Sequence, residues 1–362
     1  MAVLNDEQSM LKDAAKSWVQ DKSPVTAFRK MRDSGVDIGY DAAAWNEMAE
    51  MGWAGVIIPE EYGGSNFGYL SMGLILEELG RTLTASPLLV SGMAAASALV
   101  LGGSDAQKTE WLPKIAEGTA VAALAIDEGP HHAPDKVAAT FAGGKITGKK
   151  SFVLEGFKAD LLVVSAKGPD GVGLYLVRGD DPGVSRTRLA LADSRGAANI
   201  EFKGAAAEPL SGGAATLEKV LDRARAGLSA EMLGAAVQAF ETTLDYLKVR
   251  VQFGQVIGSF QALQHRAAKM FTDLELARSC VEAALAAIDN NSPDVPELVS
   301  LAKAKMGDTL HLVSNEMVQM HGGIGMTDEH DSGLYMKRAR VAEALFGSAS
   351  FHRDRYAKLS GF

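Results

Sequence analysis

The sequence predicts an α+β protein in which a helical N-terminal domain, an antiparallel β domain and a C-terminal helical bundle follow one another. Three observations predict this order. Apolar residues recur at helical spacing in the first and last thirds of the chain, whereas the middle third carries short apolar runs between turn residues. The length of 362 residues is typical of two or three packed units. We expect the domains to cover residues 1–118, 119–214 and 215–362.

The N-terminal domain shows its helices through apolar spacing. Residues 4–19 place apolar side chains at helical intervals, and Asp6 is a candidate cap for this helix. A further helix is expected over residues 69–81. Residues 107–115 predict a short helix that Pro113 breaks.

The middle and C-terminal domains differ in the period of their apolar residues. In the middle domain, turn residues such as Gly143-Gly144 separate strand-like runs, expected at residues 121–126, 138–141, 161–166, 173–177 and 198–202. The C-terminal domain returns to long amphipathic helices rich in Ala, Leu, Met and Gln, expected at residues 217–250, 260–290 and 295–321.

Composition and charge exclude several classes of protein. Hydrophobic residues make up 47% and charged residues 22% of the chain, and a net charge of −9 without a basic stripe argues against a nucleic-acid partner. The N-terminus is charged, and the most apolar run, residues 88–101, is shorter than the roughly twenty residues of a membrane span. We therefore expect a buried helix there, no signal peptide and no membrane partner. With one cysteine, Cys280, and no metal-ligand spacing, the chain is expected to be cytoplasmic and free of metal.

The strongest local motif is Arg250-Val251-Gln252-Phe253-Gly254-Gln255, which follows a long helix. An arginine beside a tight glycine turn can clamp a phosphate, because its guanidinium presents paired donors and glycine lets the backbone approach closely. The alternative is a helix–helix turn with a surface arginine.

A second motif is the glycine cluster in residues 319–327, QMHGGIGMT. The glycines can be a helix C-cap and nothing more, or they can form a concave backbone surface for a phosphate or adenine. His321, taken alone, is a packed residue more often than a ligand.

Together, these two motifs resemble the C-terminal half of the acyl-CoA dehydrogenase family, which carries R-x-x-F-G and then Q-x-x-G-G. The loop at residues 58–64, IPEEYGG, and the helical–β–helical order match this family as well, so the resemblance extends along nearly the whole chain. It implies FAD as the cofactor and α,β-dehydrogenation of an acyl-CoA thioester as the reaction. By that resemblance, six residues hold the adenosine and pyrophosphate end of an FAD bound mainly to a neighbouring subunit: Arg250, Gln252, Phe253, Gln319, Gly322 and Gly323.

The segments that face the flavin ring in the family are altered here. Members usually have Thr-Glu at the end of the first β-domain strand and then a Gly-Ser-Asp loop, whereas this chain has Asp127-Glu128 and then His131-His132. A surface loop is the expected setting of these histidines. The family's Trp-Ile-Thr appears as Phe152-Val153-Leu154, and Leu154 cannot hydrogen-bond to a flavin edge.

The family's catalytic base, a glutamate, is missing at both positions where members carry it. Most members have it in a Glu-Gly-Thr turn near the C-terminus, where this chain has Phe346. A minority have it on the helix before the arginine motif, where this chain has Ala224. Neither side chain can accept a proton. Arg225, which follows Ala224, matches a family arginine and is a candidate substrate contact.

Three nearby acids are candidate replacements for the base. Asp222 lies about 200° around the helix from Ala224, and Glu231 lies on roughly the same face as Ala224 but about 10 Å further along the axis. Glu343 precedes Phe346 by three residues and is expected on a different surface. We expect a solvated or salt-bridged role for each acid, and Glu231 as a substitute base stays open.

A chain without the base cannot remove the α-proton at a normal rate, because loss of a positioned general base costs about 10²–10⁴-fold. We therefore expect this chain to be the base-lacking subunit of a heteromeric acyl-CoA dehydrogenase. It would bind the adenosine and pyrophosphate end of an FAD whose ring lies in a glutamate-bearing partner subunit. Residues 322–340 resemble the small subunits of paired bacterial enzymes for steroid side-chain or pimeloyl-CoA esters. The resemblance also implies electron-transfer flavoprotein as the electron acceptor.

Three other functions stay open. A self-sufficient dehydrogenase would use an unrecognised base such as Glu231. A flavin monooxygenase of the same fold would need no α-proton base. A scaffold that has lost both ligands would bind neither FAD nor an acyl-CoA.

Overall fold

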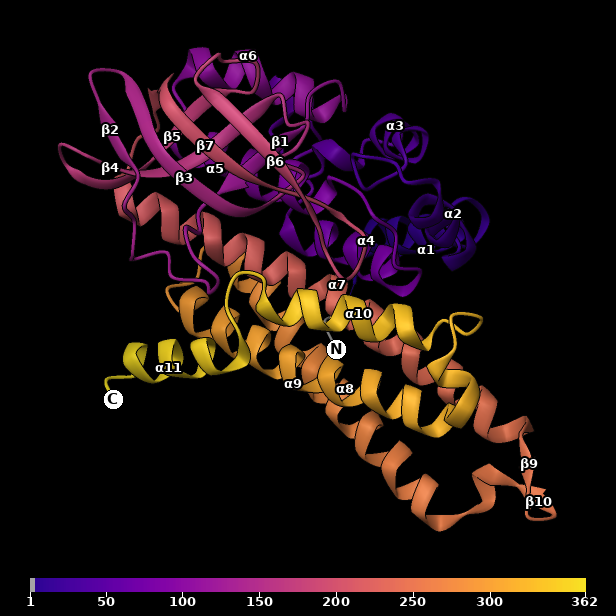
Figure 1. Cartoon of the computed structure of the whole chain (residues 1–362). Coiled ribbons are helices and arrows are strands. Elements are labelled where there is room, and N and C mark those ends of the chain that lie inside the picture. Colours follow the sequence, from indigo (N-terminus) through magenta and orange to yellow (C-terminus); the bar gives the residue numbers. More distant parts are fainter. Residues whose placement is uncertain (1–3) are drawn as a thin grey trace. The chain divides into compact units, whose positions relative to one another are not determined.

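Residues 4–362, which the computed structural model describes, divide into two units that each gather segments from distant parts of the sequence (Figure 1). Of these residues, the bundle unit comprises 4–28, Gly73–Thr84 and Leu228–Phe362, and the sheet unit comprises Arg29–Met72 and Ala85–Gly227. The predicted order of helices, strands and helices along the chain is confirmed. The three-domain boundaries stay a prediction.

Helices α2 (Val25–Ser34), α4 (Tyr69–Arg81) and α7 (Gly213–Val249) each contribute residues to both units. The helices that lie wholly within the sheet unit are α3 (Ala42–Glu50), η1 (Trp53–Gly55), η2 (Glu60–Tyr62), η3 (Leu88–Ala95), α5 (Ala96–Gly102) and α6 (Asp105–Ala116). The apolar run at residues 88–101 is helical and largely buried, as predicted, but its first part, η3, is a π-helix.

The prediction that Pro113 breaks its helix is wrong. Helix α6 continues through Pro113 to Ala116. Proline removes one backbone donor, but Leu112 and Ile115 are fully buried on either side of it, so packing keeps the last turn helical.

Eight strands form one sheet in the order β6-β7-β3-β2-β4-β5-β8, with β1 paired to β4. The strands are β1 (Ala122–Ala125), β2 (Thr140–Ala142), β3 (Lys145–Leu154), β4 (Leu161–Gly168), β5 (Gly171–Arg178), β6 (Val184–Ala190), β7 (Gly196–Ala206) and β8 (Glu208–Pro209). The expected purely antiparallel pairing is corrected, because β1 runs parallel to β4 and β2 also pairs with β4 in parallel. All four residues of β1 are buried, which is typical of a strand in a parallel pair.

Apolar runs do not predict β3 and β6. In β3 only Ile146, Lys150 and Val153 are buried, and in β6, at the edge of the sheet beside β7, no residue is fully buried. Strands with one accessible face carry many polar residues, so a search for continuous apolar stretches passes over them.

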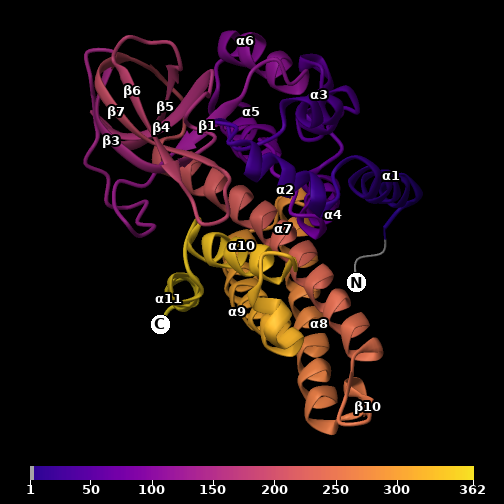
Figure 2. The ribbon, with the colours of Figure 1, turned by 45° about the vertical axis from the view of Figure 1, so that its right-hand side comes forward.

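The bundle unit is built from long helices, and α9 contacts α8, α10 and α11 (Figure 2). Besides its parts of α2, α4 and α7, its elements are α1 (Asp6–Lys22), the hairpin strands β9 (Val251–Gln252) and β10 (Gln255–Val256), η4 (Ile257–Ser259), α8 (Gln261–Asp289), α9 (Val295–His321), η5 (Gly322–Met326), α10 (Ser332–Ala344) and α11 (Ala349–Leu359). The predicted helices over residues 217–250, 260–290 and 295–321 are confirmed within a few residues.

The cap of α1 differs from the prediction. Asn5, and not Asp6, is the N-cap, because its side chain accepts a hydrogen bond from the Gln8 backbone while the Gln8 side chain accepts one from the Asn5 backbone. Within residues 4–362, no helix combines the length and the apolar character that crossing a membrane requires.

Two glycines let α4 and α7 touch backbone to backbone inside the bundle unit. A Cβ atom on Gly80 would lie 2.0 Å from the carbonyl oxygen of Glu231, and one on Gly234 would lie 1.7 Å from the carbonyl oxygen of Glu77. No side chain fits at either position, so the helix crossing depends on glycine from both helices.

Replacing Gly234 by alanine is therefore expected to destabilise the protein by about 1–3 kcal/mol, the usual cost of overpacking a filled site. At a helical glycine with free space around it, the same replacement would stabilise the protein, because alanine favours the helix over glycine by up to about 1 kcal/mol. Gly333 in α10 is the matched control, since a Cβ atom added there would have no atom within 4 Å. Denaturant unfolding of the two alanine variants measures the difference, and equal stability would contradict the close crossing.

Candidate functional site

The arginine motif forms a hairpin at the end of α7. The Arg250 amide donates to the Tyr246 carbonyl, and Gln252 pairs with Gln255 across the turn. Both turn residues, Phe253 and Gly254, have positive φ angles of 55° and 78°, as a two-residue type I′ turn requires. Phe253 is 92% exposed as a result, and Arg250 and Gln252 are exposed beside it.

The glycine motif lies where α9 ends. His321 is the last helical residue, and Gly322 has a φ of +62° that favours glycine. No atom lies within 4 Å of a Cβ placed on Gly322 or Gly323, and Gln319 is exposed. The backbone here is therefore open to close approach by a ligand.

Tyr246 links the two motifs within the bundle unit. Its hydroxyl donates to the His321 carbonyl over 3.4 Å, and its ring centroid lies 4.4 Å from that of His321. The His321 ring also lies beside that of His330, with centroids 4.2 Å apart and planes tilted by 40°, and burial lowers the pKa of His321 below its ordinary value. A cation, an exposed aromatic ring and an open glycine backbone thus belong to one connected part of the chain. This set fits the adenosine diphosphate end of FAD.

Hydrogen bonds of its own side chains hold the loop around Asp127 and His132 in the sheet unit. Asp127 accepts hydrogen bonds from His132 Nδ1 at 3.0 Å and from the Ala133 amide at 3.1 Å. Glu128 accepts from two backbone amides and from Lys150 Nζ at 2.7 Å. Burial alone would raise the pKa of Glu128, but the bonds from Lys150 and the backbone hold it below its ordinary value.

The prediction of a surface setting for both histidines is wrong for His132. Its side chain is only 2% exposed, whereas His131 is exposed as expected. The fully buried Arg225 guanidinium lies 3.1 Å from His132 Nε2 and donates to Asp222 at 2.9 Å. Arginine side chains only donate hydrogen bonds, so His132 Nε2 accepts from Arg225. His132 Nδ1 therefore carries the proton and donates the hydrogen bond to Asp127. This network occupies Arg225, the candidate substrate contact, and the sequence carries no local signal for it.

The two positions of the missing base are apolar and buried. Ala224 lies in the sheet unit with no exposed surface, and Phe346 lies in the bundle unit with 8% exposure. Phe346 has a φ of 54° and Gly347 one of 109°, and the Phe346 carbonyl lies 3.0 Å from His352 Nε2. A turn is therefore formed where the resemblance predicts the family's glutamate, and Phe346 brings no carboxylate to it.

Each acid considered as a replacement is ion-paired inside its own unit. Glu231 Oε1 lies 3.0 Å from Nε and 2.9 Å from Nη2 of Arg338, and both side chains are buried. Asp222 is held by Arg225, and Glu343 pairs with Arg340 at 2.8 Å. An arginine therefore engages each of these three carboxylates.

The remaining ring-end positions are also apolar. Phe152 is 46% exposed with a φ of 53°, and its amide donates to Asn199 Oδ1 at 3.2 Å. Leu154 is half-buried at the end of β3 and offers no hydrogen bond from its side chain. The donor set that remains fits the nucleotide end of FAD better than its ring end.

Comparison with known proteins agrees with this set of motifs. Residues 5–119 match the model of the acyl-CoA dehydrogenase N-terminal domain, and residues 211–360 match that of the C-terminal domain. The chain is 32% identical over 345 residues to the acyl-CoA dehydrogenase IpdE2 of Mycobacterium tuberculosis, with 95% of this chain and 94% of that protein covered.

Solved structures show the same relationship. The chain is similar to the Tcur3481-Tcur3483 steroid ACAD, with a TM-score of 0.91, 31% identity and 98% of both chains covered. It is also similar to the ChsE4-ChsE5 complex from Mycobacterium tuberculosis, with a TM-score of 0.92, 26% identity and both chains fully covered. This chain therefore belongs to the acyl-CoA dehydrogenase family, FAD-dependent oxidoreductases that act on CH–CH groups.

Proposed function

We propose that this chain is the base-lacking subunit of a heteromeric acyl-CoA dehydrogenase and holds the nucleotide end of an FAD whose ring lies in a glutamate-bearing partner subunit. One observation carries the proposal. Both glutamate positions hold apolar side chains, Phe346 and Ala224, while Arg250, Gln252 and Phe253 of the nucleotide-end motif stay exposed.

The groups of the two motifs have distinct roles in this proposal. Arg250 pairs with the pyrophosphate, and Phe253 and Gln252 contact the adenosine from the hairpin. Gln319, Gly322 and Gly323 offer side-chain and backbone donors from the end of α9. When bound, FAD supplies the hydride acceptor, and the proton acceptor belongs to the partner subunit.

The names of similar structures support a heteromer. One is a complex of ChsE4 with ChsE5, and another pairs Tcur3481 with Tcur3483 in a steroid ACAD. We infer that the substrate is a bulky acyl-CoA ester such as a steroid side-chain thioester. We further propose electron-transfer flavoprotein as the acceptor, a cytoplasmic location, and domains at residues 1–118, 119–214 and 215–362.

Co-expression with a glutamate-bearing homologue tests the proposal. We expect the two chains to copurify with one FAD per pair and to dehydrogenate an acyl-CoA, whereas the chain alone is expected to be inactive. Glutamine in place of the partner's base should abolish turnover and leave FAD bound. A homo-oligomer of this chain with full FAD and turnover would overturn the heteromer.

The same preparations separate the other functions. Oxygen consumption with added reduced flavin would indicate a monooxygenase, which needs no α-proton base. A protein that stays colourless with every partner would indicate a scaffold without cofactor.

A further inference from the structure

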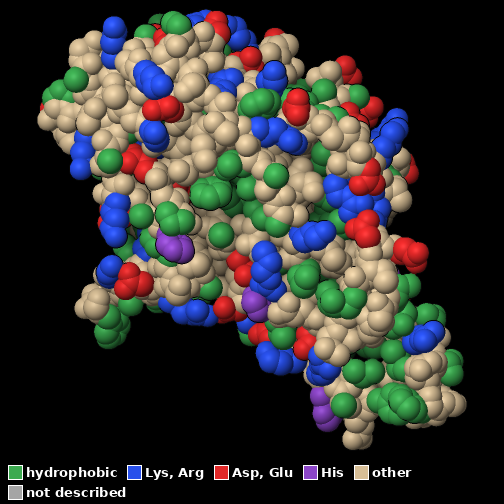
Figure 3. Space-filling model, viewed as in Figure 1, with side chains coloured by type: hydrophobic (Ala, Val, Ile, Leu, Met, Phe, Trp, Pro, Cys, Tyr) green, Lys and Arg blue, Asp and Glu red, His purple; other side chains and the backbone are tan. Residues whose placement is uncertain are grey.

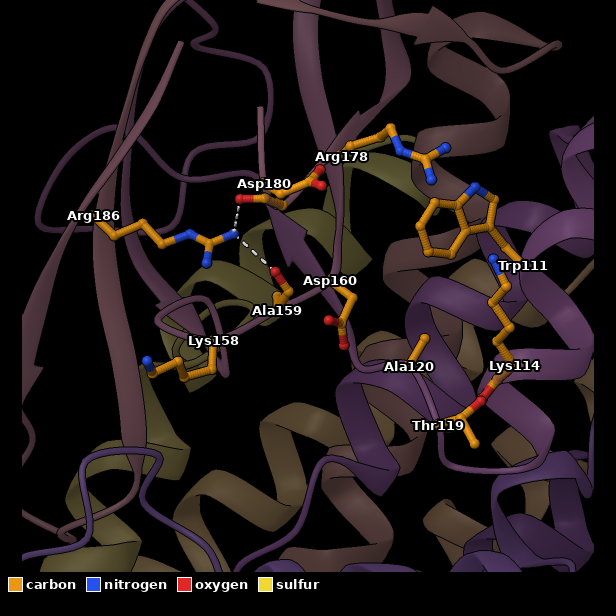
Figure 4. A pocket seen from close by; sticks show the side chains of 11 residues that line it. Trp111, Lys114, Thr119, Ala120, Lys158, Ala159, Asp160, Arg178, Asp180 and Arg186 are labelled. Carbon is orange, nitrogen blue, oxygen red and sulfur yellow. Dashed lines mark hydrogen bonds between the residues drawn. The ribbon is translucent and has the colours of Figure 1, made fainter. Parts of the chain in front are cut away.

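A cavity of about 470 Å³ in the sheet unit lies outside the proposed FAD contacts (Figure 4). It opens between α6, the end of β5, β6 and the segment before β4. Its charged lining comprises four cations and two carboxylates: Lys114, Lys158, Arg178, Arg186, Asp160 and Asp180. The lining of the cavity is therefore positively charged, although the whole chain has a net charge of −9.

Arg186 gives the cavity a fixed positive charge. Its guanidinium donates to the carbonyls of Phe157 at 3.1 Å, Ala159 at 2.8 Å and Gly179 at 2.9 Å. Its Nε is buried without a hydrogen-bond partner, and among residues 4–362 no carboxylate lies within ion-pair distance of Arg186. Burial lowers the pKa of Arg186, and the nearby Asp160 opposes that shift. A half-buried cation without an ion pair favours an anion beside it.

The backbone segments that surround the Arg186 guanidinium pack closely against each other. A Cβ on Gly179 would lie 2.0 Å from the Ala159 carbonyl oxygen, so only glycine permits this approach. The Gly179 amide also donates to the Asp160 carbonyl at 2.7 Å, and Asp160 Oδ2 accepts from the Val121 amide at 2.8 Å. One of the two acids in the lining is therefore already engaged by the backbone.

The other three cations of the lining come from different elements. Figure 4 shows Lys158 on the same side as Arg186, with Lys114 and Arg178 on the opposite side near Trp111. Lys114 and Arg178 lie 4.9 Å and 5.2 Å from the Trp111 ring and both also pair with Glu110. Lys158 is exposed, and its ammonium lies 5.5 Å from the centroid of the Phe157 ring. Lys158 is thus the cation most available to a ligand.

An adjacent cavity provides an internal comparison. It has a volume of about 150 Å³ and shares Trp111 and Arg178 with the first. Its other charged residues are the acids Asp181 and Glu208, so its charge has the opposite sign. An anion is therefore expected in the larger cavity and not in the smaller one.

We propose that the larger cavity binds a phosphate-bearing small molecule through Lys158, Arg178 and Arg186. Lysine and arginine on several sides suit a compact polyanion, and the volume lies in the range of small-molecule sites, about 300–1,000 Å³. The site is independent of the proposed FAD contacts, because none of those residues lines it.

Calorimetric titration of the full chain with pyrophosphate tests the site. We expect saturable binding that weakens at high salt. Lys158→Glu should weaken binding by at least about tenfold, the factor associated with one charge-assisted hydrogen bond. The matched control is Lys203→Glu, which reverses a lysine whose side chain is 72% exposed on β7, away from the cavity. It should bind as the unaltered chain does.

Arg250→Ala separates this site from the nucleotide clamp, and pyrophosphate binding that survives this change supports the cavity. Binding lost only in Arg250→Ala would overturn the cavity proposal and leave the FAD proposal standing. Absence of saturable binding, or equal loss in the Lys158 and Lys203 variants, would also overturn it. Inorganic phosphate and ADP, titrated into Arg250→Ala, then distinguish a free-phosphate site from a nucleotide site.

Discussion

Replacing Arg250 by alanine is expected to weaken the binding of FAD to the proposed heteromer by about ten- to a hundredfold. A charge-assisted hydrogen bond contributes about 1.5–3 kcal/mol, and each 1.4 kcal/mol is about tenfold in affinity. Arg250 is exposed at the end of α7, immediately before the hairpin, so its removal leaves the fold of the bundle unit unchanged. Equilibrium dialysis or flavin fluorescence of the two-subunit complex measures the effect.

Lys248 provides the control for this experiment. It is a neighbouring cation whose side chain is 68% exposed and pairs with Asp245. Lys248→Ala should leave the affinity for FAD unchanged, and Arg250→Lys should restore part of it, because lysine keeps the charge but loses the paired donors. Equal FAD affinity in Arg250→Ala and the unaltered complex would remove Arg250 from the nucleotide clamp.

Replacing Glu231 by glutamine is expected to destabilise the protein by about 3–5 kcal/mol, while turnover per folded molecule of the proposed heteromer stays unchanged. The change removes the Glu231 carboxylate from a buried ion pair with Arg338, and breaking a buried pair by removing one partner has this typical cost. Denaturant unfolding measures the loss of stability, and acyl-CoA dehydrogenation by the folded complex measures turnover.

Two further variants sharpen this test. Glu343→Gln removes a carboxylate whose side chain is 23% exposed and paired with Arg340, so the expected cost is only about 0–1 kcal/mol. A double variant with methionine at both Glu231 and Arg338 should recover much of the stability, because it leaves no charge behind. Normal stability with abolished turnover in Glu231→Gln would identify Glu231 as the base.

Local patterns predicted most of the fold. The helix expected at residues 69–81 and the one at 295–321 begin and end where α4 and α9 do. Strands β3 and β6, which the apolar runs did not predict, have polar accessible faces, and the parallel partner of β1 is set by contacts 39 residues away. Sheet pairing depends on long-range packing, which no local window contains.

The candidate site was predicted unevenly. Sequence motifs located the hairpin and the glycine turn, because turn geometry places demands on particular residues such as Gly254 and Gly322. They did not predict the network of His132, since its contact with Arg225 joins positions 93 residues apart. Nor did the sequence indicate the basic cavity, whose cations come from separate helices, strands and loops.

The hairpin has a consequence for how cells handle this protein. Val249, Val251 and Phe253 are 73%, 53% and 92% exposed at the end of the bundle unit, where Figure 3 shows hydrophobic side chains at the surface. Exposed apolar side chains of this kind promote aggregation and recognition by chaperones. For the proposed heteromer, we expect copies made in excess of the partner subunit to be degraded, so that degradation of the unassembled chain sets the ratio of the two subunits.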